Sequence, residues 1–321
     1  MPETGAGPAA LPDAPADAPV VLVAGGTGTL GRQVVARLAA RGLRVRVLTR
    51  DPERARPLEG PGVEIVVGDV QDPDAVARAA AGVRTVVSAV HGFVGPDAAG
   101  PQAVDWRGNL NLVRAAAAAG AEHLVLVSAQ GAAPDHPIEL YRMKLRAEEA
   151  LRASGLAWTI LRASAFMETW AMLVGEPLLR TGKTTVFGRG RNPLNFVSAH
   201  DVAAFVELAV TDPALRGATV DVGGPENLTF REVVATFERE TGRRGTTRHV
   251  PLPVMRLASV LMRPFHPGLA RQIQAGVVMD TFGMAFDGTE RARRYPSIPL
   301  TTLAEVVRRD HLPARAAAPA P

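Results

Sequence analysis

Residues 20–31 decide the fold, and they read Val20-Val-Leu-Val-Ala-Gly25-Gly-Thr-Gly28-Thr-Leu-Gly31. An apolar run ends in three glycines spaced three apart, and apolar residues at helical spacing follow, which is typical of a buried strand, a tight turn and a helix. The first two glycines let backbone approach a pyrophosphate, the third lets the helix pack on the strand, and the helix N-terminus favours phosphate. The stretch predicts a dinucleotide-binding turn; a turn that binds nothing is the alternative.

The end of the next strand bears on the choice of dinucleotide. The apolar stretch 43–48 lies where a βαβ unit returns to the sheet, and Thr49 and Arg50 follow it. An acidic residue there bonds the ribose 2′-hydroxyl of NAD, whereas an arginine accommodates the 2′-phosphate of NADP. The sequence favours NADP(H). NAD(H) bound through Asp51, with Arg50 in solvent, is the less favoured alternative.

Composition narrows the class of protein. The 321 residues suffice for one large domain, or one domain and a lobe. The absence of cysteine excludes disulfides, thiolate metal sites and cysteine nucleophiles, and fits a cytoplasmic protein. No His, Asp and Glu cluster has metal-ligand spacing, so no metal is expected. Residues 1–18 lack the basic and apolar parts of a signal peptide and are interpreted as a disordered leader, and 313–321 as a flexible tail.

The partners expected from composition are small molecules. No apolar run reaches the roughly 18 residues of a membrane span. The net charge is +4, and the basic residues are not interleaved with aromatic ones, so neither nucleic acid nor a membrane is expected as a partner. The chain is expected to be a monomer or a homodimer.

Strand and helix patterns alternate along the first half of the chain, which predicts an α/β fold with a doubly wound parallel sheet. The expected strands are 20–24, 44–49, 63–67, 84–89, 122–128 and 157–162, and the expected helices are 30–42, 72–81, 105–119 and 138–154. Residues 19–163, with 196–223 returning to them, are expected to form the cofactor domain, and 164–195 with 224–312 a substrate lobe. Thr229-x-x-Glu232 and Thr302-x-x-Glu305 are interpreted as capping boxes, Asp201 as a helix N-cap, and the Pro-rich stretches 251–267 and 296–299 as connections.

In a doubly wound sheet the ligand lies at the carboxyl ends of the strands, so the residues that follow each strand are the cofactor candidates. Asp69 is placed to accept from the adenine amine, with an Asx turn or a helix N-cap as the equal alternative. The predicted cofactor-binding residues are Gly25, Thr27, Gly28, Thr29, Leu30, Gly31, Arg50, Asp69, Val70, Ala89 and Lys144.

Seven motifs make the chain resemble the NmrA-like, isoflavone-reductase-like branch of the atypical short-chain dehydrogenase/reductases, and the similarity runs from about residue 19 to 310. They are Gly25-Gly-Thr-Gly-Thr-Leu-Gly31, Leu48-Thr-Arg50, Gly68-Asp69, Val104-Asp-Trp-Arg-Gly-Asn109-Leu-Asn111, Leu124-Val-Leu-Val-Ser128, Ser154-Gly-Leu-Ala-Trp-Thr-Ile-Leu-Arg162 and Phe196-Val-Ser-Ala-His-Asp201. The resemblance implies a Rossmann fold and NADP(H). It does not imply one reaction, because the branch includes reductases, isomerases and silent NADP sensors.

The expected catalytic pair departs from the superfamily pattern. Most members use Tyr-x-x-x-Lys, in which the lysine holds the nicotinamide ribose and the phenol donates a proton to the carbonyl. Here Leu140 stands four residues before Lys144, and Tyr141 stands three before it. Tyr141 is either a rotated catalytic residue or a packing residue. Lys144, one of two lysines among 36 basic residues, either serves the ribose, as in isoflavone-reductase-like enzymes, or pairs with Glu148 on the helix surface.

Six further residues are candidates for contact with substrate. His91 can exchange a proton near neutral pH, with a loop histidine that bonds backbone as the alternative. Ser128 ends its strand, and by the resemblance Gln130 stands at the superfamily position of the serine nearer the nicotinamide. The other candidates are Phe93 and the apolar Phe166, Met167 and Trp170, which either line a pocket or belong to the core. The chain is therefore interpreted as an NADPH-dependent oxidoreductase acting on a carbonyl, quinone or activated C=C. A non-catalytic NADP(H) sensor, or a redox-neutral isomerase or cyclase, is the alternative.

Overall fold

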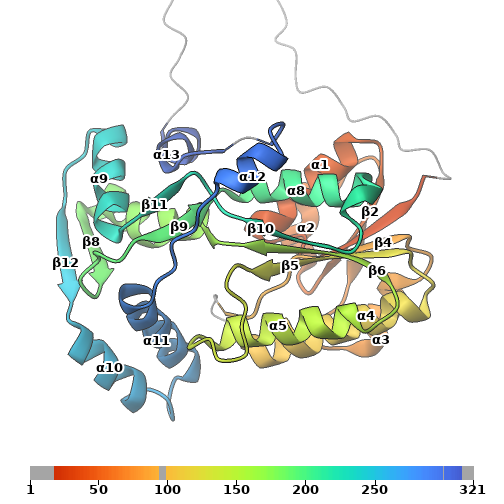
Figure 1. Ribbon diagram of the computed structural model, residues 1–321, viewed down its shortest axis with the longest axis horizontal. Coiled ribbons are helices and arrows are strands. Elements are labelled where there is room, and N and C mark those ends of the chain that lie inside the picture. Colours follow the sequence, from red (N-terminus) through yellow and green to blue (C-terminus); the bar gives the residue numbers. More distant parts are fainter. Residues whose placement is uncertain (1–17, 94–98, 299, 313–321) are drawn as a thin grey trace, which may run out of the picture.

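The computed structural model describes residues 18–93, 99–298 and 300–312, and its largest element is a seven-stranded parallel sheet. The strand order is β10-β6-β5-β4-β1-β2-β3 (Figure 1). The bounds are β1 Val20–Ala24, β2 Arg44–Thr49, β3 Val63–Val67, β4 Thr85–Ser88, β5 His123–Ala129, β6 Ala157–Ala163 and β10 Ala218–Val222. The predicted doubly wound α/β fold is confirmed, and each predicted strand ends within one residue of its observed end.

Helices cover both faces of this sheet (Figure 1). Helices α1 (Thr29–Ala40) and α8 (Ala199–Thr211) lie on one face, and α3 (Pro73–Ala80), α4 (Asn109–Ala118) and α5 (Glu139–Arg152) lie on the other. The strands are apolar on both sides, because each face buries its own core: Val34, Val47 and Phe205 belong to one, and Leu22, Leu112 and Leu151 to the other. Such continuous burial is what a parallel sheet requires.

The helix predicted at 105–119 begins earlier and differently. Residues Gln102–Gly108 form a π-helix, η2, that continues into α4. Asp105 lies on this π-helical turn and is completely buried. Sequence periodicity does not signal a π-helix, which occurs mostly as a single turn and frequently at functional sites.

The rest of the chain forms two small sheets with their own helices and a third core around Met167, Phe196 and Phe237. The strands are β7 Ala165–Phe166, β9 Leu194–Val197 and β11 Glu226–Leu228 in one sheet, and β8 Lys183–Phe187 and β12 Thr246–Val250 in the other. The helices are α6 Met167–Trp170, α7 Glu176–Thr181, α9 Phe230–Thr241, α10 Leu252–Leu261, α11 Pro267–Thr281, α12 Thr289–Arg294 and α13 Leu303–His311, with the short α2, Pro52–Ala55, in the large-sheet part.

Both predicted capping boxes are confirmed at the starts of α9 and α13. The interpretation of 251–267 as a connection is wrong, because it contains α10 and the start of α11. Proline stands in the first turn of each of these helices, where its missing N–H has no helical partner to lose. The predicted leader and tail, apart from Ala18, lie outside the described residues, as does Pro299.

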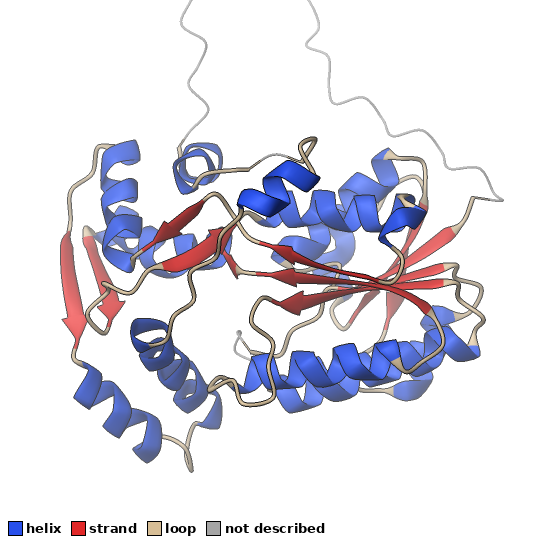
Figure 2. Cartoon of the chain, in the orientation of Figure 1, coloured by secondary structure: helices blue, strands red, loops and turns tan. Residues whose placement is uncertain are grey.

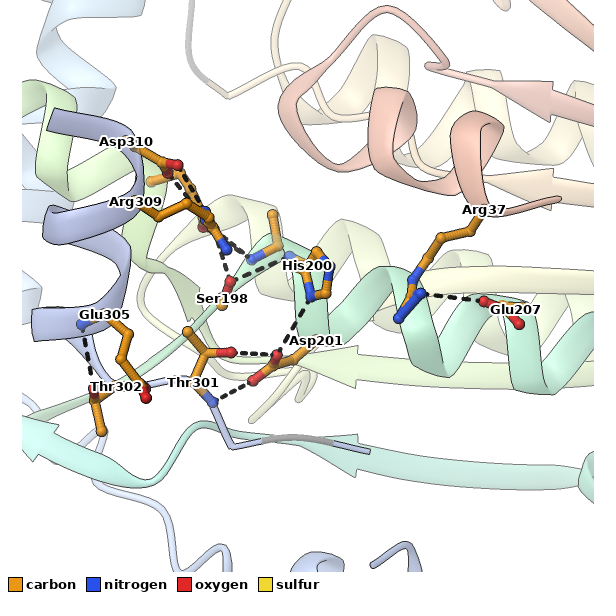
Figure 3. A network of polar contacts seen from close by, with 12 residues as sticks. Arg37, Ser198, His200, Asp201, Glu207, Thr301, Thr302, Glu305, Arg309 and Asp310 are labelled. Carbon is orange, nitrogen blue, oxygen red and sulfur yellow. Dashed lines mark hydrogen bonds and ion pairs between the residues drawn. The ribbon is translucent and has the colours of Figure 1, made fainter. Parts of the chain in front are cut away.

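A polar network fixes α13 to the N-terminus of α8 (Figure 3). Ser198, not Asp201, is the N-cap of α8, so that interpretation of Asp201 is wrong. The buried Asp201 carboxylate accepts hydrogen bonds from the backbone N–H and the hydroxyl of Thr301, at 2.8 and 2.7 Å. Arg309 on α13 pairs with Glu168, which also accepts from Ser198. The C-terminal helix is thereby attached to the cofactor half of the molecule.

Candidate functional site

The predicted site residues gather at one edge of the large sheet. Because all seven strands are parallel, the loops that follow β1 to β5 leave the sheet on the same side, where open α/β sheets bind ligands. Figure 2 shows the arrowheads of the large sheet directed toward the two small sheets, so the edge faces the second part of the chain.

The glycine turn between β1 and α1 has no room for side chains. A Cβ on Gly31 would lie 2.1 Å from the carbonyl oxygen of Gly25, and a Cβ on Gly25 would lie 2.7 Å from that of Ala89. Gly25 also has a φ of 84°, which favours glycine. Gly28 is the N-cap of α1 and has no side chain to occupy the free N–H groups of the first turn. The turn therefore fits a pyrophosphate, with the exposed Thr29, the half-buried Thr27 and the buried Leu30 in the same segment.

The charged residues that follow β2 and β3 differ in how many hydrogen bonds and ion pairs they already make within the protein. Asp51 is the N-cap of α2 and accepts from the N–H of Arg54 at 3.3 Å. Arg50 is exposed, and its nearest carboxylate is Asp69 at 3.9 Å. Asp69 accepts from the N–H of Gln71 at 2.9 Å, which is the Asx-turn alternative, although its side chain stays partly accessible. The guanidinium of Arg50 is thus the least engaged of these charged groups.

Lys144 is buried, so it is not the exposed surface residue of the second alternative. Its ammonium donates to the carbonyl oxygens of Val90 and Val127, at 2.9 and 3.0 Å, and lies 3.1 Å from the carboxylate of Asp105. Two of its three N–H donors are engaged by these carbonyls, while the facing Asp105 Oδ1 is buried and has no hydrogen-bond partner among the described residues, so the Asp105 contact is a close ion pair without hydrogen-bond geometry. The surface pair with Glu148 does not form, because Glu148 bonds Ser128, Arg152 and Arg162 instead.

Asp105 is a site residue that sequence reasoning missed. Its other carboxylate oxygen accepts from the N–H of Gly92 at 2.9 Å, so it links Lys144 to the backbone that follows β4. On the same helical stretch Asn109 bonds Ser88 at the end of β4, and Asn111 bonds the carbonyl of the buried Val70 after β3. Asp105 and Asn109 are four residues apart, a helical spacing of polar residues that was the available signal.

Tyr141 lies in an apolar cluster rather than beside Lys144. Its ring stacks on His136 with centroids 3.9 Å apart, and it packs with Phe93 and Leu140 against Val278 of α11. Burial raises the pKa of Tyr141 to about 12, since the phenolate loses hydration there. A catalytic tyrosine requires a lowered pKa. The surroundings of Tyr141 are therefore those of a residue that packs in the core, which was the second interpretation of its role.

His91 follows β4, next to the Asp105–Lys144 pair. The side chain is accessible to solvent, yet surrounding protein atoms lower its pKa, with the nearby Lys144 charge adding to the effect and Asp105 opposing it. The imidazole is therefore neutral at pH 7 and carries one N–H donor. Gln130, half-buried, follows β5 at the same edge, and Ser128 is turned away into its bond with Glu148.

The three apolar substrate candidates separate in the structure. Met167 is completely buried in the third core, and Trp170 packs against Phe230 with ring centroids 5.0 Å apart. Both side chains therefore belong to the core, in agreement with the alternative to a pocket-lining role. Phe166, half-buried at the end of β7, packs against the sheet core instead. Among the described residues, no group of His, Asp or Glu side chains is arranged to hold a metal ion.

The chain matches the model of the NAD(P)H-binding family over residues 25–213, which is more than half of its length. It therefore belongs to that family, and the dinucleotide cofactor expected from the glycine turn is confirmed. Within the family it is an atypical short-chain dehydrogenase/reductase of the isoflavone-reductase and NmrA-like branch, as the sequence motifs implied.

Curated relatives agree with a reductase. An NAD(P)H azoreductase of Xenophilus azovorans is 32% identical over 70% of this chain and 74% of that protein. The (4-alkanoyl-5-oxo-2,5-dihydrofuran-3-yl)methyl phosphate reductase of Streptomyces griseus is 36% identical over 78% of this chain and 83% of that protein. Photosystem II assembly factor Ycf39 of Synechocystis is 32% identical over 76% and 74%. The expected class, an NAD(P)H-dependent reductase, is confirmed, and the substrate is left open.

A solved structure shows the same fold. The NADPH-dependent quinone oxidoreductase QOR2 of Escherichia coli, complexed with NADPH, superimposes with a TM-score of 0.72 at 22% identity, covering 90% of this chain and 99% of that one. Helices in the described part of this chain are too short or too polar to cross a membrane.

Proposed function

We propose that this chain is an NADPH-dependent reductase that transfers hydride to a carbonyl, a quinone or an activated C=C of an apolar small molecule. The observation that carries the proposal is that the pyrophosphate turn, the neutral His91 and the apolar cluster of Phe93 and Tyr141 border the same edge of the sheet. Residues 164–195 and 224–312 would then form the substrate lobe, and 19–163 with 196–223 the cofactor domain.

The preference for NADPH over NADH is supported by the contacts of Asp51 and Arg50, because the carboxylate is already used within the protein and the guanidinium is largely not. Asp51 already caps α2 and is poorly placed to serve a ribose hydroxyl as well. Arg50 is exposed and holds only a long contact to Asp69, so its guanidinium is available for a 2′-phosphate. The Asp69 carboxylate, turned by its bond to Gln71, remains accessible for the adenine amine.

The chain's own residues would position substrate and move the proton. The bound cofactor supplies the hydride. His91 is the preferred candidate for a hydrogen bond to the acceptor oxygen, because its imidazole is neutral, is accessible to solvent and follows β4. For Lys144 to hold the nicotinamide ribose, a ribose hydroxyl has to replace one of its two carbonyl partners, while Asp105 acts as its positioning residue.

The test is steady-state NADPH oxidation with a quinone, an enone and an aldehyde as acceptors. Arg50→Ala is expected to lower kcat/KM for NADPH by about 10- to 100-fold, the usual value of a hydrogen bond to a charged group, and to leave NADH unaffected. Arg78→Ala, which removes an exposed arginine from α3, is the matched control and should change neither value. Equal losses with NADPH and NADH would assign Arg50 a structural role instead.

A second candidate function is a non-catalytic NADP(H) sensor or scaffold. The raised pKa of Tyr141 and the burial of Lys144 beside Asp105 favour it, because both leave the usual proton donor of the superfamily without a counterpart. The likeness to a photosystem II assembly factor points in the same direction. Tight NADPH binding without turnover of any of the three acceptors would favour this candidate over the reductase.

A further inference from the structure

Helix α10 presents an unusually apolar surface to solvent. It packs mainly on α11, through Met255 and Ser259, and most of its remaining circumference is open. Five large apolar side chains on α10 and in the turn after it are between 54% and 76% exposed: Val254, Leu257, Val260, Leu261 and Phe265. Contiguous exposed apolar side chains of this kind mark interaction surfaces, whereas single ones do not.

The same region is purely cationic. Residues 241–279 contain six arginines and no aspartate or glutamate, so this segment alone exceeds the net charge of +4 of the whole chain. Five of the arginines are exposed: Arg243, Arg244, Arg248, Arg256 and Arg263. None of the five lies within 4.0 Å of a carboxylate of the described residues. This segment therefore carries a local excess of positive charge.

The combination of apolar and cationic side chains indicates the occupant. Arg256 lies on α10 and Arg263 in the turn that follows it, before and after Val260 in the chain, while Val254, Leu257 and Leu261 recur at helical spacing on α10. A second copy of the chain related by a two-fold axis would bring these arginines against their own counterparts. An anionic lipid surface satisfies both features, because headgroups pair with arginine and acyl chains accept leucine and phenylalanine.

We propose that the α10 surface, comprising the five apolar side chains together with Arg256 and Arg263, docks on an anionic membrane surface, with the arginines of β12 and the loop before it adding to the positive charge of this segment. The chain lies on the bilayer through this helix and does not span it. This binding is separate from the reductase function and does not depend on it. The inference departs from the expectation, drawn from the sequence, that a membrane is no partner of this chain.

The docking surface is continuous with the candidate site through one helix. Helix α11 packs on α10, and its Ala275 and Val278 contact the cluster that contains Phe93 and Tyr141. Figure 1 shows α10 and α11 side by side, with α11 between α10 and the end of α5. A protein docked in this way holds its substrate edge close to the lipid phase, where apolar acceptors such as quinones concentrate.

The test is flotation of the full chain with vesicles of phosphatidylcholine alone, and of phosphatidylcholine with about one third phosphatidylglycerol. Binding is expected only to the second, and it should weaken as salt is added. Arg256→Glu/Arg263→Glu should weaken binding by at least about 30-fold, since each arginine near such a surface contributes about a fivefold step and two are lost. Leu257→Gln/Leu261→Gln should also weaken it, without changing the charge.

The matched control is Arg78→Glu/Arg114→Glu, which changes the net charge equally on the exposed sides of α3 and α4. This variant should float like the wild type, and all variants should retain the far-UV circular dichroism of the wild type. Absence of flotation with anionic vesicles, or an equal loss in the control, would overturn the proposal. So would a dimer in sedimentation that Leu257→Gln/Leu261→Gln dissociates. Because the assay contains neither cofactor nor acceptor, its failure would leave the reductase proposal standing.

Discussion

Replacing Asp105 by asparagine isolates the energetics of the buried ion pair at the site. The Asp105 carboxylate is completely buried, and Lys144 is 6% exposed, with 3.1 Å between the charged atoms. At an effective dielectric constant of about 20, their attraction is about 5 kcal/mol. Asparagine retains an oxygen for the N–H of Gly92 but leaves the ammonium without its counter-charge. Removing one partner of a buried pair costs about 3–5 kcal/mol, so Asp105→Asn should lower the free energy of unfolding by that amount.

The measurement is equilibrium urea unfolding at pH 7, followed by circular dichroism. Lys144→Met should be destabilised to a similar degree, because it leaves a buried carboxylate. The double variant Asp105→Asn/Lys144→Met contains neither charge and should recover at least about 2 kcal/mol relative to the sum of the single changes. Glu122→Gln, in the exposed pair with Arg84, is the control and should cost less than about 1 kcal/mol.

Two results would refute this reasoning. One is a stability of Asp105→Asn within about 1 kcal/mol of the wild type, which would mean that water or a neighbouring group compensates the ammonium. The other is strict additivity in the double variant, which would show that the two charges do not interact in the folded protein.

Three further predictions concern the turn, the tyrosine and acid stability. Gly31→Ala should weaken NADPH binding at least about tenfold in calorimetry, because helix α1 must move away from the Gly25 carbonyl, whereas Gly60→Ala, with open space around it, should not. Tyr141→Phe should keep near-wild-type turnover, since loss of a general acid costs about 100-fold or more; a loss of that size would restore its catalytic role. Burial lowers the pKa of His123 to about 4, so the unfolded chain binds its proton first as the pH falls below the ordinary value of 6.5. The free energy of unfolding should therefore fall between pH 6.5 and 4, by at most about 3 kcal/mol from this group, and His123→Gln should flatten that slope in urea titrations.

The parts of the fold that depend on local chemistry were predictable. Glycine at 25, 28 and 31 has a steric reason that acts within a few residues, and the structure shows the contacts that enforce it at Gly25 and Gly31. Strand periods and capping boxes are likewise local, which is why strands and the starts of α9 and α13 agree with the sequence.

Contacts between residues that are far apart in the sequence were not predictable, because they depend on which elements pack together in the fold. Lys144 was expected at the surface or on a ribose, but its partner Asp105 is 39 residues away on a π-helical turn that no periodicity signals. Asp201 looked like a cap from its position, yet it accepts from Thr301, 100 residues later. In 251–267, frequent proline suggested a connection. Proline also occupies the first turn of helices, as it does in α10 and α11, so its frequency alone does not distinguish the two cases.

The position of β10 has a consequence for dividing the protein into fragments. This strand completes the large sheet beside β6, and α8 packs on α1, although both follow the excursion through β7, β8 and β9. A fragment that stops at residue 163 would expose the apolar face that α8 covers, and one that starts at 164 would lack the sheet on which β10 pairs. Expression of the cofactor half alone therefore requires a designed linker from β6 directly to α8, because no single cut separates the two halves.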